Sequence, residues 1–451
     1  MNTASPFLRS ALNDFDPARR DHALREYAAQ ADTLGTPLSD AIANMHCHSF
    51  FSYNALGMSP SALTVMARDQ GIGLLGLVDF DVVDGVDEFL GACALLGVRG
   101  GASIETRVYV PEFADREINS PGEPGVLYHM GTGFVSSTVP AAVQPVLDDL
   151  AARAQQRNEA LVARVNAHLA PVTVDYAADV LPLTPKGNAT ERHIVAAYIA
   201  AVDAQTDDAA AFWSDRLGVP RAQVDAAMQT DYGLANLVRK ALMKKGGAAY
   251  VPPGPDTFPK VEQFHAFVIG SGGIPCATWL DGTSPGEQAL PELLDLLIGK
   301  GAATFNIIPD RNWNIADAAV KEVKVRNLYA AVEMAADNAL PILVGTEMNS
   351  PGQPLVDQFD AGVGARARPL LGRRISSTAT PCWDAMARSA TPATGPAVTL
   401  TPVAPPTRFT LPWGAVCRPA HAASRSSSAC RRIRRPKTSS RHCRQNKASH
   451  R

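Results

Sequence analysis

The feature that most constrains this chain is a series of short apolar runs, each followed by a residue that can bind a metal ion or a phosphate group. The first run ends in His46-Cys47-His48, and the second, at residues 73–78, ends in Asp79. In an extended strand, residues two apart point to the same side, so His46 and His48 can share one metal ion or one phosphate. Repetition of this pattern favours a sheet that carries polar side chains at one end.

Helical patterns separate most of the apolar runs. Ser59 fits an N-cap, Pro60 fits the first helical position, and Gly71 ends that helix. Further helices are predicted at 86–96, 140–169, 287–298 and 320–338, and strands at 41–45, at 73–78, up to 104, and at 125–128, 274–279, 303–308 and 341–344. This alternation predicts an α/β fold of parallel strands joined by helices. Barrels of this kind place their chemistry just after the strands, where these candidate ligands stand: Asp79, Glu105, His129, Asp281 and Glu347.

The same pattern predicts five segments. A helical extension at 1–40 precedes the first part of the barrel at 41–185, an Ala-rich helical insertion at 186–250 interrupts it, and its second part covers 251–360. The tail at 361–451 holds 17 Lys and Arg residues and one acidic residue, Asp384. We expect this tail to be disordered, or to be a coding sequence translated out of frame. Nucleic-acid binding through its basic run at 431–437 is the alternative.

Composition excludes several other classes of protein. Apolar residues make up 46% of the chain and charged residues 19%, as is usual for a soluble protein. The sequence has no apolar run of about 18 residues that could span a membrane, and residues 1–13 lack a signal-peptide pattern, so a cytoplasmic protein is expected. The cysteines have no regular spacing, which argues against a disulfide framework or a zinc knuckle. Oligomeric state does not follow from the sequence.

Several short motifs between residues 40 and 360 resemble those of the polymerase and histidinol phosphatase (PHP) family. They are His46-Cys47-His48-Ser49, Val78-Asp79-Phe80-Asp81, Ile104-Glu105, Tyr128-His129-Met130-Gly131, Gly272-Gly273-Ile274-Pro275 and Gly345-Thr346-Glu347-Met348-Asn349. A further segment, Thr190-Glu191-Arg192-His193-Ile194, is similar to the Thr-Arg-Pro-His-Ile of the family's metal-dependent phosphoesterase branch.

The resemblance implies a distorted (β/α)7 TIM-like barrel that hydrolyses a small phosphate ester or a nucleotide-type substrate. The residues that match family metal ligands are His46, His48, Asp79, Glu105 and His129, and Glu347 stands where the family usually has Asp. His193 matches a histidine near the substrate phosphate. Imidazole and carboxylate ligands suit zinc, manganese or iron, and such ions activate water and neutralise charge on phosphate oxygens.

The chain departs from the family pattern at three positions where the family has histidine. These positions hold Phe80, Trp279 and Asn349, which are poor or impossible ligands for a transition metal. Asp81 could compensate for Phe80, and Asp281 for Trp279. We therefore expect one or two divalent ions instead of three. A binding or regulatory protein on the same fold, without catalysis, is the alternative function.

The loop at residues 309–314, which follows a predicted strand, adds candidates for substrate binding. Arg311 could hold a substrate phosphate, and Trp313 could stack on a sugar or a base; alternatively, this loop only caps a helix. Some of the candidate metal ligands could instead have structural roles. Asp79 could be a turn residue, Glu105 could form a surface ion pair with the nearby Arg107, and His129 could be a hydrogen-bonded core histidine.

Overall fold

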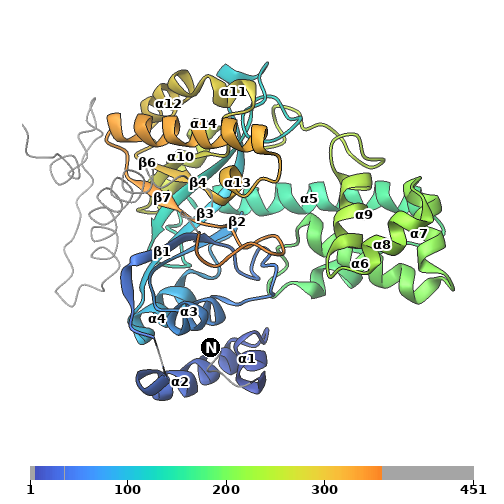
Figure 1. Ribbon diagram of the computed structural model, residues 1–451, viewed down its shortest axis with the longest axis horizontal. Helices are drawn as coiled ribbons and strands as arrows, with labels where there is room; N and C mark the ends of the chain where they lie inside the picture. The colour runs from blue at the N-terminus through green and yellow to red at the C-terminus, as the bar shows by residue number, and fades with distance from the viewer. Residues whose placement is uncertain (1–5, 35, 358–451) are drawn as a thin grey trace, which may run out of the picture. The chain divides into compact units, whose positions relative to one another are not determined.

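Seven strands form one sheet whose order in space is the order in the chain (Figure 1). The computed structural model describes residues 6–34 and 36–357, so the predicted tail at 361–451 lies outside the described residues. The strands are β1 (Ser39–Cys47), β2 (Ile72–Phe80), β3 (Arg99–Tyr109), β4 (Val126–Phe134), β5 (Ile274–Trp279), β6 (Thr304–Ile307) and β7 (Ile342–Val344). The predicted α/β fold is confirmed.

The sheet is mixed, which corrects the prediction of parallel strands throughout. β4 is antiparallel to both β3 and β5, whereas all other neighbouring strands are parallel. A parallel neighbour needs a crossover, usually a helix, but β3 and β4 are joined only by irregular chain and the three-residue 3-10 helix Pro111–Phe113. Consequently, Glu105 and His129 lie in the interiors of long strands, not at strand ends.

The sheet curls until its first and last strands meet beside the histidine pair. The amide of His48 donates to the carbonyl of Glu347 at 2.8 Å, and the amide of Glu347 donates to the carbonyl of His46 at 2.7 Å. These bonds form a parallel bridge between Cys47 and Glu347. Closure therefore brings Glu347 next to the opening motif, although it lies 299 positions after His48 in the chain.

Helices cover the outer side of the sheet around one large apolar core. Ser59 caps α3 as predicted, because its side chain accepts a hydrogen bond from the Ala62 amide. Besides α1 (Pro6–Leu12), α2 (Pro17–Leu34) and the start of α5 (Gln144–Leu169), the helices around this core or between the strands are α3 (Pro60–Asp69), α4 (Val86–Leu96), α10 (Val261–Gly270), α11 (Pro285–Gln288), α12 (Leu290–Gly299), α13 (Asp310–Trp313) and α14 (Ala318–Asp337).

A second apolar core lies in the helical region between β4 and β5, and it begins before the insertion predicted at 186–250. It is built from the C-terminal half of α5 (Gln144–Leu169), a π-helical turn at Tyr176–Val180, a 3-10 turn at Leu181–Leu183, and the helices α6 (Glu191–Gln205), α7 (Ala209–Leu217), α8 (Arg221–Met228) and α9 (Gly233–Met243). Figure 1 shows these four helices gathered around the far end of α5. The core begins at Leu161, so α5 belongs to the barrel side at its start and to the insertion at its end.

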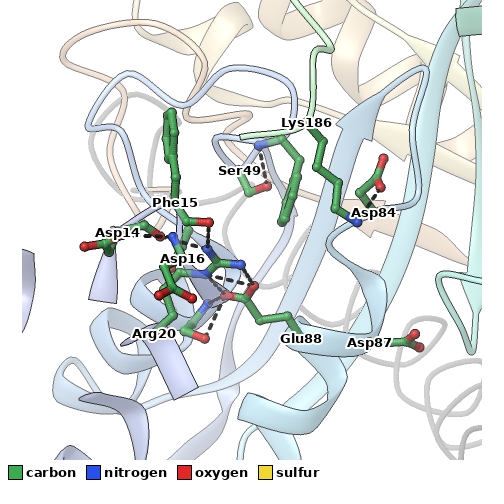
Figure 2. Close-up of polar contacts among 12 residues, drawn as sticks. Asp14, Phe15, Asp16, Arg20, Ser49, Asp84, Asp87, Glu88 and Lys186 are labelled. Atoms are coloured by element: carbon green, nitrogen blue, oxygen red, sulfur yellow. Dashed lines mark hydrogen bonds and ion pairs between the residues drawn. The ribbon is translucent and has the colours of Figure 1, made fainter. Parts of the chain in front are cut away.

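The N-terminal helices α1 (Pro6–Leu12) and α2 (Pro17–Leu34) pack against α3 and α4. Arg20 of α2 is 4% exposed and bonds to Glu88 of α4 at 2.6 Å and to the Asp14 carbonyl at 2.7 Å (Figure 2). Its guanidinium also lies 5.1 Å from the centre of the Phe50 ring. This extension therefore supports the loop that follows His48.

No helix within the described part of the chain is both long enough and apolar enough to cross a membrane.

Candidate metal centre

Three buried side chains converge where β1 and β3 face the interior of the curled sheet. The Nε2 atoms of His46 and His48 are 3.3 Å apart, and each lies 3.3 Å from Oε2 of Glu105. All three residues are at most 4% exposed. Within residues 6–34 and 36–357, this is the group of His, Cys, Asp and Glu side chains close enough to hold a metal ion.

The hydrogen bond at Nδ1 of each imidazole ring, opposite the Nε2 atom in the cluster, sets the tautomer of that ring. Nδ1 of His46 lies 3.2 Å from Oδ1 of Asn306, whose amide nitrogen is already bonded to the Leu343 carbonyl. Nδ1 of His48 lies 3.3 Å from Oγ of Ser52, which donates its own proton to Asp79. Both Nδ1 atoms therefore face acceptors and carry the proton, so both Nε2 atoms present lone pairs.

Two imidazole lone pairs and one carboxylate thus point at the same small space. Three such groups repel one another unless a cation or a proton lies between them. Ligands bound tetrahedrally at about 2.0–2.1 Å from a zinc ion are separated by about 3.3–3.4 Å, and the observed separations are 3.3 Å. The donor set therefore fits a divalent transition-metal ion in both chemistry and spacing.

The electrostatics of Glu105 and His46 fit a cation as well. Burial raises the pKa of Glu105, but its contacts with His46 and His48 outweigh this effect and lower the pKa to about 2. Burial lowers the pKa of His46, but the charge and hydrogen bond of Glu105 outweigh it and raise the pKa. The carboxylate is therefore ionised and attracts positive charge. Because Glu105 is buried and contacts two imidazoles, the reading of this residue as part of a surface ion pair is wrong.

Asp79 lies beside the cluster but is directed toward the loop after β1. It accepts hydrogen bonds from the Ser49 amide at 2.8 Å and from the Ser49 and Ser52 hydroxyls, both at 2.6 Å. Burial raises its pKa, against the effect of these bonds. Asp79 thus holds the loop and orients His48 through Ser52, which is the usual part played by a carboxylate behind a ligand histidine.

Phe80 covers one side of His48. The two rings are stacked, with centroids 4.6 Å apart and an interplanar angle of 18°. Asp81, the residue suggested as a substitute ligand, accepts a hydrogen bond from Thr106 and lies 3.9 Å from the Arg157 guanidinium. Among the residues described, Asp81 therefore lines the cavity beside the cluster without joining it.

Glu347 stands at the point where the sheet closes, with a left-handed φ of 66°. Its side chain is 6% exposed and forms an ion pair with Arg311. The charge of Glu347 contributes to the raised pKa of His46, so the carboxylate acts on the cluster electrostatically. Glu347 and Arg311 both line the same cavity as His46 and Glu105.

His129 lies on the other side of the sheet. Its neighbours Tyr128 and Met130 pair with Arg107 and Glu105 of β3, which places His129 on the outer face. There its Nε2 lies 2.7 Å from Nε2 of His265 in α10. The geometry does not bring this predicted ligand to the cluster, because side chains alternate between the two faces of a strand.

Two other predicted residues also lie apart from the cluster. Asp281 pairs with Lys324 at 2.9 Å and accepts a bond from Thr283. His193 is held in the capping box of α6, where its Nδ1 accepts a hydrogen bond from the Thr190 amide at 3.0 Å. Burial lowers the pKa of His193 to about 4. His193 is therefore a neutral helix-capping group next to the cavity wall formed by Thr190.

Trp313 does not face the cavity, which corrects the expectation that it stacks on a substrate. It is 7% exposed, and its indole nitrogen donates to Asp357 at 2.8 Å. Trp279 is likewise buried in the apolar core. Asn349, in contrast, lines the cavity and accepts a hydrogen bond from Ser350 at 3.2 Å.

The cluster opens on a cavity of about 570 Å³ between the sheet and the helical insertion. Among the described residues that line it, seven are cationic and five are acidic. The cations are Arg107, Arg157, Arg164, Arg192, Arg239, Lys244 and Arg311, and the acids are Asp81, Glu105, Glu123, Glu191 and Glu347. This excess of positive charge suits an anionic ligand.

Most residues that line the cavity were not predicted from the sequence. Arg107 follows Glu105 by two residues, so the alternation of β3 could have placed both on the cavity side. No local signal identifies Asn306, which lies inside the short β6, or the cations of the insertion such as Arg239. These residues meet the cluster only because distant segments fold onto it.

Comparisons with known proteins give only distant likenesses. No family model and no curated protein matches the chain. A structure from Bifidobacterium adolescentis described as a metal-dependent phosphoesterase is 18% identical, with a TM-score of 0.44. An amidohydrolase structure from Chromobacterium violaceum, with bound sulfate and no metal, is 16% identical, with a TM-score of 0.45. Each match covers 73% of this chain and 96% of the other. At such scores, the assignment of the site rests on the geometry of this chain.

Proposed function

We propose that this protein is a metal-dependent phosphoester hydrolase of the PHP type, acting on a small phosphorylated substrate. The observation that carries the proposal is the triangle of His46, His48 and Glu105, whose donor atoms are 3.3 Å apart and buried. Three protein ligands are the number found in catalytic zinc sites, whereas structural sites usually have four. The ion would be zinc, manganese or iron.

The residues around the triangle have distinct tasks in this proposal. Asn306 and Ser52 hold His46 and His48 in the tautomer that offers Nε2 to an ion. When bound, a divalent ion supplies Lewis-acid chemistry, which activates water and polarises a phosphoryl oxygen. Arg311 binds phosphoryl oxygens from the cavity wall, and the stacked Phe80 keeps bulk water from one side of His48.

The cavity supports an anionic substrate. Its seven cationic and five acidic lining residues leave an excess of positive charge before any ion binds. Arginine binds phosphate well, because its fork of donors matches two oxygens of the phosphate group. Tyr53, Tyr128 and Phe258 add ring surface to the same wall, which suits a substrate with an organic group of moderate size.

The test combines metal analysis with an activity assay. The purified protein, depleted of metal and reloaded with Zn²⁺ or Mn²⁺, is expected to hydrolyse p-nitrophenyl phosphate or bis(p-nitrophenyl) phosphate, and His46→Ala is expected to abolish both metal binding and hydrolysis. His22→Ala, which changes an exposed histidine of α2, is the matched control and should retain both. Wild-type protein that binds no ion would contradict the proposal.

A non-catalytic binding protein on the same fold is the second candidate. The observation that favours it is the stacking of Phe80 on His48, together with the full engagement of Asp79 by Ser49 and Ser52. These contacts restrict the number of ligands that can serve the centre. Metal binding at His46 and His48, with phosphorylated compounds bound but not hydrolysed, would support this candidate.

A further inference from the structure

The ion pair between Arg311 and Glu347 has an unusual position. Arg311 lies in the short helix α13 after β6, and Glu347 lies where β7 meets β1. The Glu347 side chain is only 6% exposed, whereas that of Arg311 is 41% exposed. Both residues line the cavity together with His46 and Glu105. The guanidinium therefore stands at the wall next to the candidate metal centre.

Four of the five described carboxylates that line the cavity form ion pairs with Arg or Lys. Glu123 faces Arg107 at 3.1 Å, and Asp81 faces Arg157 at 3.9 Å. Glu191 faces both Arg239 and Lys244, at 2.9 and 2.7 Å. Glu347 faces Arg311.

Glu105 is different from these four carboxylates. Within the described chain its ionic partners are the imidazoles of His46 and His48, which are themselves candidate ligands of the same ion, and no Arg or Lys pairs with it. Glu105 is thus the carboxylate in the cavity wall that is left for a divalent ion.

A second ion beside the first would need its own ligands. Asp79 is engaged by Ser49 and Ser52 and is directed away from the cavity. Phe80 covers the neighbouring side of His48. The remaining acidic group near His46 is Glu347, and a guanidinium already neutralises it. The arrangement therefore provides one complete ligand set and one carboxylate bound to a fixed cation.

We propose that Arg311 takes the place of a second metal ion, so that the centre binds one divalent ion at His46, His48 and Glu105. This inference rests on the function proposed above. A guanidinium keeps its charge at any working pH and has five N–H donors. With one donor on Glu347, others remain for a phosphoryl oxygen. Arg311 would thus supply the positive charge that a second ion supplies in two-metal sites.

The proposal is tested by the number of zinc ions bound per chain. Wild-type protein and three variants are depleted of metal, dialysed against Zn²⁺ and then against metal-free buffer, and analysed for zinc by mass spectrometry. Arg311→Met removes the charge, and Arg311→Lys keeps it. Arg192→Met is the matched control, because Arg192 lines the same cavity but bonds to the neutral Asn236 and Ser350.

One zinc ion is expected for the wild type, Arg311→Lys and Arg192→Met. Two are expected for Arg311→Met, since Glu347 then loses its guanidinium partner and becomes an unpaired carboxylate in the wall of the same cavity. Circular dichroism and thermal unfolding of each variant establish that it is folded.

Three outcomes would overturn the proposal. Two ions in the wild type, or one in Arg311→Met, would show that Arg311 does not replace an ion, while the metal centre itself would stand. Two ions in Arg192→Met would show that any loss of charge in the cavity has the same effect. No ion in any variant would instead refute the metal centre, and with it the proposed function.

Discussion

Two pairs of buried histidines lie on opposite faces of the same sheet. His46 and His48 face the cavity, with their Nε2 atoms 3.3 Å apart. His129 and His265 lie on the outer face, with their Nε2 atoms 2.7 Å apart. All four side chains are at most 2% exposed, so the two pairs differ in their partners and not in their burial.

His129 and His265, the outer pair, are linked by a hydrogen bond that continues to the Lys300 carbonyl. Nδ1 of His265 lies 2.8 Å from the Lys300 carbonyl and donates to it, which leaves its Nε2 as an acceptor for Nε2–H of His129. Burial lowers the pKa of both imidazoles, and the proximity of His265 lowers that of His129 further. These two rings are neutral and need no cation between them.

His46 and His48, the inner pair, are not linked by a hydrogen bond of this kind. Both Nδ1 atoms are occupied by acceptors, so both Nε2 atoms present lone pairs toward Glu105. The carboxylate raises the pKa of His46 against the effect of burial. The comparison indicates which buried imidazoles could hold a cation: those whose far nitrogens meet acceptors and whose group is completed by a carboxylate.

Replacing Glu105 by Gln tests the contribution of the carboxylate and should have the largest effect. A change behind a ligand costs about 10–100-fold in metal affinity, so the loss of a ligand should lower Zn²⁺ affinity by at least about 100-fold. Isothermal titration calorimetry measures this, with Glu123→Gln, another acidic residue of the cavity wall, as control. Equal Zn²⁺ affinity in Glu105→Gln and wild type would show that the carboxylate is not what distinguishes His46 and His48 from the histidine pair on the outer face.

Replacing Asn306 by Leu tests the tautomer argument. Without the acceptor at Nδ1, His46 is no longer held with its Nε2 lone pair toward the site, and Zn²⁺ affinity should fall by about 10–100-fold. Asn306→Asp keeps an acceptor and should retain tight binding. If both substitutions weakened Zn²⁺ binding equally, the acceptor would not be the feature that prepares His46.

Replacing His129 by Leu should affect stability but not metal binding. The change leaves Nε2 of His265 without its donor, and an unsatisfied buried polar group costs about 1–3 kcal/mol. Urea unfolding of the metal-free protein measures the stability, and calorimetry with Zn²⁺ measures the affinity. A large loss of Zn²⁺ affinity would instead support the ligand role that the sequence motif predicted for His129.

Lowering the pH should destabilise the metal-free protein through the outer pair, His129 and His265. Because the folded pKa values of His129 and His265 lie below the ordinary value of 6.5, the unfolded chain takes up protons first. Their contribution to stability is therefore full above 6.5 and is lost as pH falls below it.

Unfolding free energies measured between about pH 5.5 and pH 7.5, a window around the ordinary histidine pKa, test this expectation. Wild-type protein should lose more stability on acidification than His129→Leu does. An equal loss in the two proteins would show that the outer pair does not resist protonation.

Local sequence signals were sufficient for much of the fold. The helix at 86–96 and the strand at 274–279 were predicted with the bounds observed for α4 and β5, and Ser59 caps α3 as expected. These features depend on caps, turns and apolar periodicity within about ten residues. The direction of β4 depends instead on which strands it pairs with, and the only local signal for it is the absence of a predicted crossover helix between 104 and 125.

The spacing of two residues was enough to predict that His46 and His48 point to the same side of the chain where β1 ends. Which carboxylate completes the group depends on how the strands pack. Glu105 lies on the cavity face of β3, whereas the reversed β4 turns His129 toward α10. Glu347 reaches the histidine pair only because the sheet closes, and Arg311 meets it there. Contacts of this kind arise from packing between segments far apart in the chain, which spacing within a motif does not determine.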